Sequence, residues 1–137
     1  MNLGRTRFET ELITRPDDID MNQHVHSSRY LDYVLAARYD QMERCYGFSM
    51  DEFIRAGFGW VVRTAHMEFK RPLEIERILV RTWIDEIERA DVRVNFEIVK
   101  QKNAKLSCDG WFLYTMIDLA TGRAKPIPDW ITEKYAI

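Results

Sequence analysis

The fold of this protein is decided by a segment at residues 18–30, which reads DIDMNQHVHSSRY. This segment gathers acidic, amide, imidazole and hydroxyl side chains at a point where the sequence pattern changes. Before it, residues 8–13 alternate well enough to predict a β-strand. After it, residues 28–46 show the wider apolar period of a helix. We therefore expect a polar loop that joins a strand to the N-terminus of a long helix.

The predicted helix at residues 28–46 has a broad apolar face, and a glycine at position 47 is a plausible stop. Charges at Asp32, Arg38 and Asp40 interrupt its apolar positions. These positions are Tyr30, Leu31, Tyr33, Val34, Leu35, Ala36, Ala37, Tyr39 and Met42. A second, short helix is predicted at residues 49–56, because Ser49 and Glu52 have the spacing of a capping box.

The rest of the chain has β character. Alternation at residues 60–69, 78–84, 92–99 and 106–119 predicts further strands, and residues 118–122 predict a turn. After Pro126 and Pro128 we expect only a short tail. With 137 residues, the chain is predicted to form one α+β domain, residues 1–137, with a curved antiparallel sheet of about five strands around one long helix.

Composition narrows the function classes. The chain is 46% hydrophobic and 31% charged, which is typical of a globular protein. Its net charge of −2 gives no general basic field for nucleic acid. The sequence has no run of about 18 apolar residues, so no membrane span is predicted. Residues 1–5 lack the pattern of a signal peptide, so we expect a cytoplasmic protein. Cys45 and Cys108 are predicted to be reduced structural thiols.

The polar segment suggests acyl-transfer chemistry. The first turn of a helix leaves backbone N–H groups unpaired, and the helix dipole favours negative charge there. Such a terminus can stabilise an oxyanion that develops on a carbonyl group. A carboxylate a few residues upstream, here Asp20, can activate water or attack the carbonyl directly. Together these features predict a site at the loop–helix junction.

The string DMNQHV at residues 20–25, with Tyr30 ten residues after Asp20, resembles the D-x-N-x-H-V-N-N element of hotdog-fold acyl thioesterases. It is most similar to the plant-type acyl-carrier-protein thioesterases. It also resembles bacterial acyl-CoA thioesterases related to 4-hydroxybenzoyl-CoA thioesterase. The similarity extends over most of the chain in element order and includes the EFKRP string at residues 68–72. It implies a hotdog fold and hydrolysis of acyl-CoA or acyl-carrier-protein to a free acid and a thiol.

The resemblance also implies residue roles. Asp20 would be the general base or nucleophile, while Asn22 and His24 would position water or polarise the carbonyl. Backbone N–H groups of Val25, His26 and Ser27 would hold the oxyanion. Apart from the resemblance, one of Tyr30, Tyr33 and Tyr39 is a candidate to line the acyl pocket, and Tyr30 is the one taken as substrate-binding. Candidates for the phosphates of coenzyme A are Lys70 and Arg71, with Arg123 and Lys125 as alternatives.

The sequence departs from the family pattern at three places, and at one of them Glu76 and Arg77 replace the Gly-Asp turn that the family commonly has after the strand. His26 and Ser27 stand where the family has two asparagines. Pro72 and Leu73 stand where the plant enzymes have a glutamate and a cysteine, so a Cys–His mechanism does not carry over. His26 is otherwise expected to be an exposed loop residue, and His66 a half-buried structural one. The histidines have no metal-ligand spacing. We expect no metal or redox cofactor, and coenzyme A or acyl-carrier pantetheine only as part of the substrate.

Two other functions stay open. An enoyl-thioester hydratase of the same fold has the pattern D-x-N-P-x-H, whereas this chain has Gln23 after the asparagine and His24 four residues past Asp20. A non-catalytic module that binds acyl thioesters is the other alternative. A homodimer or homotetramer is expected, because one helix leaves sheet edges or the outer face uncovered. The sequence leaves open the acyl group and the choice between coenzyme A and carrier protein.

Overall fold

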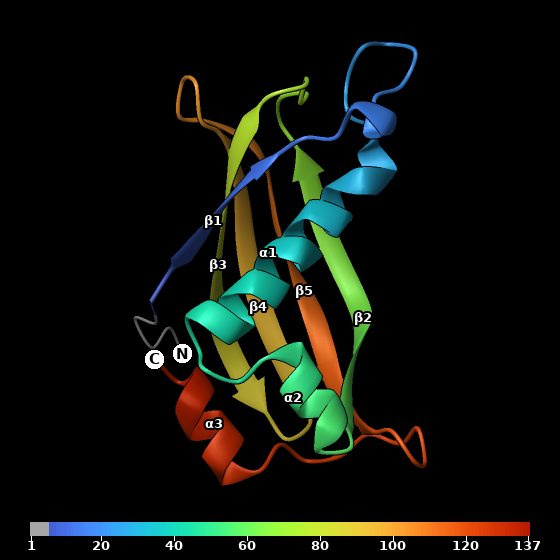
Figure 1. The fold of residues 1–137 in the computed structure, drawn as a ribbon, viewed down its shortest axis with the longest axis vertical. Coiled ribbons are helices and arrows are strands. Elements are labelled where there is room, and N and C mark those ends of the chain that lie inside the picture. Colours follow the sequence, from blue (N-terminus) through green and yellow to red (C-terminus); the bar gives the residue numbers. More distant parts are fainter. Residues whose placement is uncertain (1–5) are drawn as a thin grey trace.

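Five antiparallel strands form one curved sheet in the computed structural model, which describes residues 6–137. The strand order is β1–β3–β4–β5–β2, so β1 and β2 are the edges. The strands are β1 (Phe8–Ile13), β2 (Phe58–Phe69), β3 (Arg77–Glu88), β4 (Asp91–Lys100) and β5 (Lys105–Asp118). The helix α1 (Tyr30–Arg44) crosses one face of this sheet (Figure 1). The predicted α+β hotdog architecture is confirmed.

Two short helices complete the fold. The helix α2 (Met50–Arg55) follows α1, and α3 (Asp129–Tyr135) lies near the same end of the sheet (Figure 1). The capping box predicted for α2 is present, with Ser49 and Glu52 each accepting a hydrogen bond from the other's backbone N–H at 3.2 Å. The prediction of an irregular tail after Pro128 is wrong, because this segment forms α3 and buries Ile131 and Tyr135.

The core lies between α1 and the sheet. Strands β3 and β4 alternate between buried and half-buried residues, as antiparallel strands with one covered face do. The buried residues of α1 are Tyr30, Tyr33, Val34, Ala37, Arg38, Gln41 and Met42. Gln41 is fully buried, where its Nε2 donates to the Thr10 hydroxyl at 3.0 Å and its Oε1 accepts from Thr82. This satisfied polar contact fixes how α1 sits on β1 and β3.

The helix periodicity misassigned two residues of α1. Arg38, placed among the charged positions, is only 3% exposed, because it follows the buried Val34 by one helical turn and shares its face. Tyr39, placed among the apolar positions, is exposed, and its hydroxyl donates to Asp51 at 3.0 Å. A charge can occupy a core-facing position only if something compensates its burial.

Three smaller expectations can also be compared with the structure. His66 is not half-buried: its side chain is 52% exposed, because edge strand β2 leaves this residue uncovered beside Trp111. Both cysteines are free, and burial raises the pKa of the Cys108 thiol to about 12. No helix within residues 6–137 is both long and apolar enough to cross a membrane. The signal-peptide expectation concerns residues 1–5, which lie outside the described part of the chain.

Candidate active site at the N-terminus of the long helix

A tight turn places Asp20 opposite His24. The Asp20 N–H donates to the His24 carbonyl at 2.8 Å, and the Gln23 N–H donates to the Asp20 carbonyl at 3.0 Å. Gln23 has a φ of +64°, in the left-handed region that closes such a turn. On either side, Ile19 and Val25 form an antiparallel bridge. The local backbone therefore brings Asp20 and His24 next to each other across the turn.

The Asp20 carboxylate is oriented through one of its oxygens. Its Oδ1 accepts the Asn22 N–H at 2.8 Å and, at a longer 3.4 Å, the His24 N–H. Among the hydrogen bonds of residues 6–137, none engages Oδ2. The carboxylate is thus fixed by the turn on one side and has a second oxygen available for a substrate or a water molecule.

Backbone hydrogen bonds tie this turn to distant parts of the chain. The Val25 N–H donates to the Leu73 carbonyl at 2.7 Å, and the His26 N–H donates to the Asp18 carbonyl at 2.8 Å. The Tyr30 hydroxyl accepts the Leu73 N–H at 3.1 Å. Because both backbone groups of Leu73 are used, the segment after β2 forms a fixed wall beside the turn.

A buried ion pair supports that wall. Lys100 Nζ donates to the Pro72 carbonyl at 2.6 Å and lies 3.2 Å from Glu76 Oε2. Their side chains are only 8% and 7% exposed. A lysine in this setting can satisfy a carbonyl and a carboxylate at once, so it holds the residues on both sides of Leu73 in place.

Asp18 supports the turn from its other side. The Tyr33 hydroxyl donates to Asp18 Oδ2 at 2.7 Å and accepts the Arg15 N–H at 2.9 Å. Burial, with a smaller contribution from Asp18, raises the pKa of Tyr33 to about 12. Arg29 adds an ion pair to Asp18 at 3.6 Å. The tyrosine therefore stays protonated near neutral pH and anchors the residue whose carbonyl accepts the His26 N–H.

A single 3-10 turn, Ser27–Arg29, leads into α1. His26 caps it, with Nδ1 accepting the Ser28 N–H at 3.1 Å and lying 2.7 Å from the Ser28 hydroxyl. The N–H groups of Val25 and His26, predicted as oxyanion donors, already have the acceptors named above. Within residues 6–137, the Ser27 N–H has no acceptor, so of these three groups it alone is available to a ligand.

These residues surround one open cavity of about 340 Å³. Except for Asn22, all the predicted site residues line it. The lining consists of Asp20, His24, Val25, His26, Ser27, Tyr30, Phe69, Lys70, Arg71 and Pro72. Lys70 Nζ lies 3.8 Å from Asp109, and Arg71 Nη1 donates to the Leu106 carbonyl at 2.8 Å. Asn22 is exposed and contributes through its backbone N–H to Asp20.

Sequence reasoning missed two kinds of residue here. Phe69 lines the cavity although it is 51% exposed, and its ring packs edge-on against Tyr30 with centroids 4.9 Å apart. Its position in the EFKRP string was the available signal. Asp18 and Lys100 act as anchors through contacts between segments far apart in the sequence, which no local pattern indicates.

The long helix on a curved five-stranded antiparallel sheet, with a polar turn at its N-terminus, defines the protein as a hotdog-fold member. The model of the Thioesterase-like superfamily matches residues 14–135, and the chain belongs to this family. The long-chain acyl-CoA thioesterase FadM of Escherichia coli is 22% identical over 128 residues, which cover 93% of this chain and 96% of that protein.

Two solved structures illustrate the shared fold. A DHNA-CoA thioesterase from Staphylococcus aureus superimposes with a TM-score of 0.87 and 23% identity, covering 95% of this chain and 89% of that one. A 1,4-dihydroxy-2-naphthoyl-CoA thioesterase from Synechocystis gives 0.84 and 20%, covering 95% and 96%. At these identities the superpositions establish the fold.

Proposed function

We propose that this protein hydrolyses acyl thioesters to a free acid and a thiol in the cavity beside Asp20. The observation that carries the proposal is that two uncommitted groups belong to residues lining the same cavity: the Oδ2 of the oriented Asp20 carboxylate and the Ser27 N–H at a helix start. Membership of the thioesterase-like superfamily supports the same reaction. The names of FadM and of the two naphthoyl-CoA enzymes favour acyl-CoA over acyl-carrier-protein as the substrate.

In the proposed reaction, Asp20 acts on the thioester carbonyl through Oδ2. It either removes a proton from an attacking water or attacks the carbonyl carbon itself, giving an anhydride that water then opens. The carbonyl oxygen becomes negative in either case. The Ser27 N–H and the positive end of α1 stabilise that charge, and His24 positions the water or polarises the carbonyl. In the water route the thiolate of the pantetheine arm leaves when the tetrahedral intermediate collapses. In the anhydride route it leaves as the anhydride forms, before water opens that anhydride. In both routes the proton that the thiolate finally takes up comes from the water consumed.

The rim of the cavity suits the rest of the substrate. Lys70 and Arg71 follow β2 directly and offer positive charge for the phosphates of coenzyme A. The proposed hydrolysis needs no metal or redox cofactor, and coenzyme A or acyl-carrier pantetheine enters as part of the substrate. Tyr30 contributes the apolar body of its ring, because its hydroxyl is already engaged by Leu73.

A second copy of the chain completes the proposed site. Strand β2 is a 12-residue edge with an exposed residue at most of its positions, and Phe69 at its end is both exposed and part of the cavity. A free edge of this length is a template for pairing with another strand. We therefore propose a homodimer, alone or paired into a tetramer, in which β2 and Phe69 are covered by the partner.

The test is thiol release, followed with a chromogenic disulfide reagent, on short, medium, long and aromatic acyl-CoAs. Asp20→Asn should lower kcat/KM by roughly 10³-fold, because an amide neither accepts a proton nor attacks the carbonyl. Asp17→Asn is the matched control: Asp17 is an exposed carboxylate of the same loop outside the cavity lining, and its change should leave kcat/KM within about 3-fold.

Activity retained by a folded Asp20→Asn protein would contradict the proposed role. Two further assays separate the alternative functions. Loss of the double bond of a 2-enoyl-CoA without thiol release would indicate a hydratase. Binding of acyl-CoA without turnover, also with acyl-carrier-protein substrates, would indicate a binding module.

A further inference from the structure

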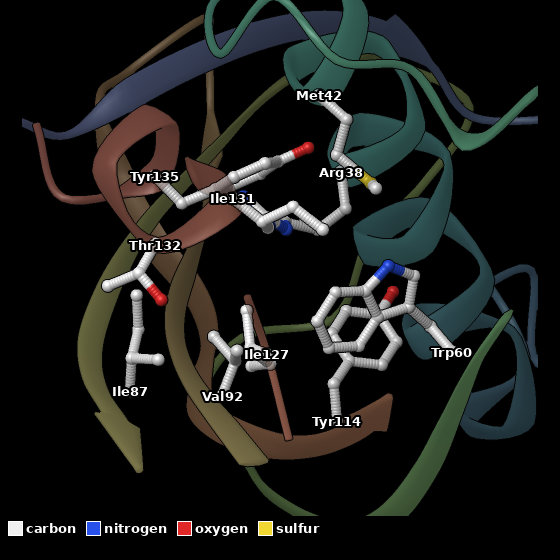
Figure 2. Close-up of a pocket in the computed structure, with 10 residues that line it drawn as sticks. All are labelled: Arg38, Met42, Trp60, Ile87, Val92, Tyr114, Ile127, Ile131, Thr132 and Tyr135. Carbon is white, nitrogen blue, oxygen red and sulfur yellow. The ribbon is translucent and has the colours of Figure 1, made fainter. Parts of the chain in front are cut away.

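A second cavity lies at the other end of α1, between this helix, the sheet and α3 (Figure 2). Its walls are mostly apolar or aromatic, and one wall comes from the C-terminal segment. The lining consists of Arg38, Met42, Trp60, Ile87, Val92, Tyr114, Ile127, Ile131, Thr132 and Tyr135. Arg38 lies eight residues beyond Tyr30, or about 12 Å along the helix axis. The two cavities are therefore separate features of the molecule.

Arg38 enters this cavity without a hydrogen-bond acceptor. It is 3% exposed, and its Nε and Nη1 are buried atoms that no group within residues 6–137 accepts from. The indole N–H of Trp60, on another wall of the same cavity, is also buried without an acceptor. All the unsatisfied buried side-chain atoms of the lining are thus donors, and two of them belong to a cation.

The nearby groups do not balance this charge. The guanidinium lies 5.3 Å from the centre of the Tyr46 ring, a cation–π contact that supplies no hydrogen-bond acceptor and no formal negative charge. The other polar groups of the lining are hydroxyls of Thr132, Tyr114 and Tyr135, and the Tyr135 hydroxyl donates to the Phe48 carbonyl at 2.6 Å. Among residues 6–137, no carboxylate is part of the lining. A buried, unpaired cation is costly to the folded state, so its retention at a core-facing position calls for a compensating ligand.

The donors and the walls of the cavity define the chemistry of a suitable ligand. Such a ligand must supply an anionic acceptor that suits a guanidinium, and a carboxylate does so with two oxygens. Its body must be apolar, because the walls around Arg38 are formed by Met42, Ile131 and the aromatic rings. We propose that this cavity binds the carboxylate end of a small apolar acid, with Arg38 as the anchor and Trp60 N–H as an additional donor.

The size of the cavity defines how such a ligand enters. About 350 Å³ is free of atoms when the open side is included, but only about 20 Å³ is wide enough for water, which is room for about one molecule. An acid therefore requires part of the wall to move. Four lining residues belong to the C-terminal segment with its seven-residue helix α3, namely Ile127, Ile131, Thr132 and Tyr135. A short terminal helix is the wall that costs least to displace.

Direct binding tests the proposal independently of any enzymatic activity. Calorimetric titration with butanoate, hexanoate and octanoate should show binding to the wild type, while hexanamide, which lacks the charge, should bind at least about 10-fold more weakly. Arg38→Met should weaken hexanoate binding by about 10-fold or more. The matched control is Arg55→Met, an exposed arginine of α2, which should leave binding unchanged. Absence of binding by any acid, or equal binding of hexanoate and hexanamide, would overturn the proposal.

Stability of the ligand-free protein gives a second, independent readout. If Arg38 is kept for a ligand, Arg38→Met removes an unpaired buried charge and fills its place with apolar atoms. The urea midpoint of the ligand-free variant should then rise above that of the wild type, and hexanoate should no longer raise it further. A lower midpoint for Arg38→Met would show that the arginine serves the fold itself, and would overturn the proposal.

Kinetics identify the source of the carboxylate. If it is the far end of a dicarboxylic acyl thioester, Arg38→Met should lower kcat/KM for adipoyl-CoA about 10-fold or more and leave hexanoyl-CoA unchanged. If the carboxylate belongs to a free acid, Arg38→Met should have the same kcat/KM as the wild type for both adipoyl-CoA and hexanoyl-CoA. Added hexanoate should then change the rate of the wild type and not that of Arg38→Met. Each result supports the carboxylate site and assigns its source. If neither the wild type nor Arg38→Met hydrolyses thioesters, the proposed function is contradicted. The carboxylate site is then still tested by the calorimetric titration, which needs no enzymatic activity.

Discussion

The two ends of α1 contrast in how they are built. At its N-terminal end, exposed and half-buried polar residues surround an open cavity. Their positions are set by hydrogen bonds to the carbonyls of Leu73 and Asp18 and by the Lys100 ammonium, which donates to the Pro72 carbonyl. At the other end, buried apolar and aromatic side chains enclose a narrow cavity around Arg38, whose Nε and Nη1 have no hydrogen-bond acceptor in the described part of the chain. There Phe53 is fully buried and Tyr135 stacks on Tyr46 with centroids 4.6 Å apart.

The contrast shows how exposure limits the ways to hold a site. Groups that act on a solvent-borne substrate cannot be fixed by hydrophobic burial, because burial would also remove them from the substrate. Directional hydrogen bonds to a rigid neighbour fix such groups instead, as the Val25–Leu73 and His26–Asp18 contacts do. The closed end has no such restriction, so apolar packing suffices there. Mutations at the open end should therefore report on the loss of polar anchors, and mutations at the closed end on the loss of buried apolar volume.

The largest effect on stability is expected from Lys100→Met at the open end. Removing the ammonium leaves Glu76 buried without its partner, so the free energy of unfolding should fall by about 3–5 kcal/mol. Urea denaturation measures this loss. The double variant Lys100→Met/Glu76→Leu removes both charges and should recover most of the loss. A single variant within about 1 kcal/mol of the wild type would show that the open end does not depend on this anchor.

The closed end should respond most to loss of apolar volume. Ile131 is 2% exposed and joins α3 to the core, so Ile131→Ala should lower the free energy of unfolding by about 2–4 kcal/mol. Thiol release should stay within about 3-fold of the wild type, since Ile131 does not line the Asp20 cavity. Ile75→Ala is the control, at an exposed isoleucine, with an expected change of about 0.5 kcal/mol or less. Equal losses for the two variants would show that burial of Ile131 does not stabilise the closed end.

A smaller, pH-dependent effect is expected from Tyr33→Phe. Its hydroxyl donates to a carboxylate, so its removal should cost about 1–3 kcal/mol at neutral pH. The pKa of Tyr33 is raised from 10.0 to about 12 in the folded protein. A raised pKa stabilises the fold fully below pH 10 and progressively less as the pH approaches 12.

The stability difference between wild type and Tyr33→Phe should therefore shrink on going from neutral pH to about pH 11 in urea denaturation. The control is Tyr39→Phe, which removes an exposed hydroxyl bonded to Asp51 and should have a smaller effect at neutral pH. A Tyr33→Phe difference that grows with pH would contradict the assigned hydrogen bond.

Asp20→Asn should cause the smallest change in stability, although it should cause the largest change in activity. The amide of Asp20→Asn keeps an oxygen that can accept the Asn22 N–H, so the turn is preserved. The free energy of unfolding should stay within about 0.5 kcal/mol of the wild type, measured by urea denaturation. A loss of several kcal/mol would mean that the carboxylate is structural, and the activity result would then need a different explanation.

Much of the fold was predictable because it rests on local periodicity. The strand at residues 8–13 coincides with β1, and the other strands were placed within a few residues of their observed ends. The turn that joins Asp20 to His24 was predictable as a site because a short string carries all its side chains. The helix α3 was missed, since a seven-residue segment after two prolines has too little pattern to distinguish it from a loop.

The order of elements, the family resemblance and the segment that carries the proposed chemistry all follow from the amino-acid sequence. Three other features depend on the folded structure: which N–H groups stay available, the support that Lys100 gives to the wall of the site, and the burial of Arg38. The physical reason is that hydrogen-bond partners and burial depend on segments brought together by folding. Val25 meets Leu73, and Arg38 meets α3, across distances in the chain that no local pattern spans.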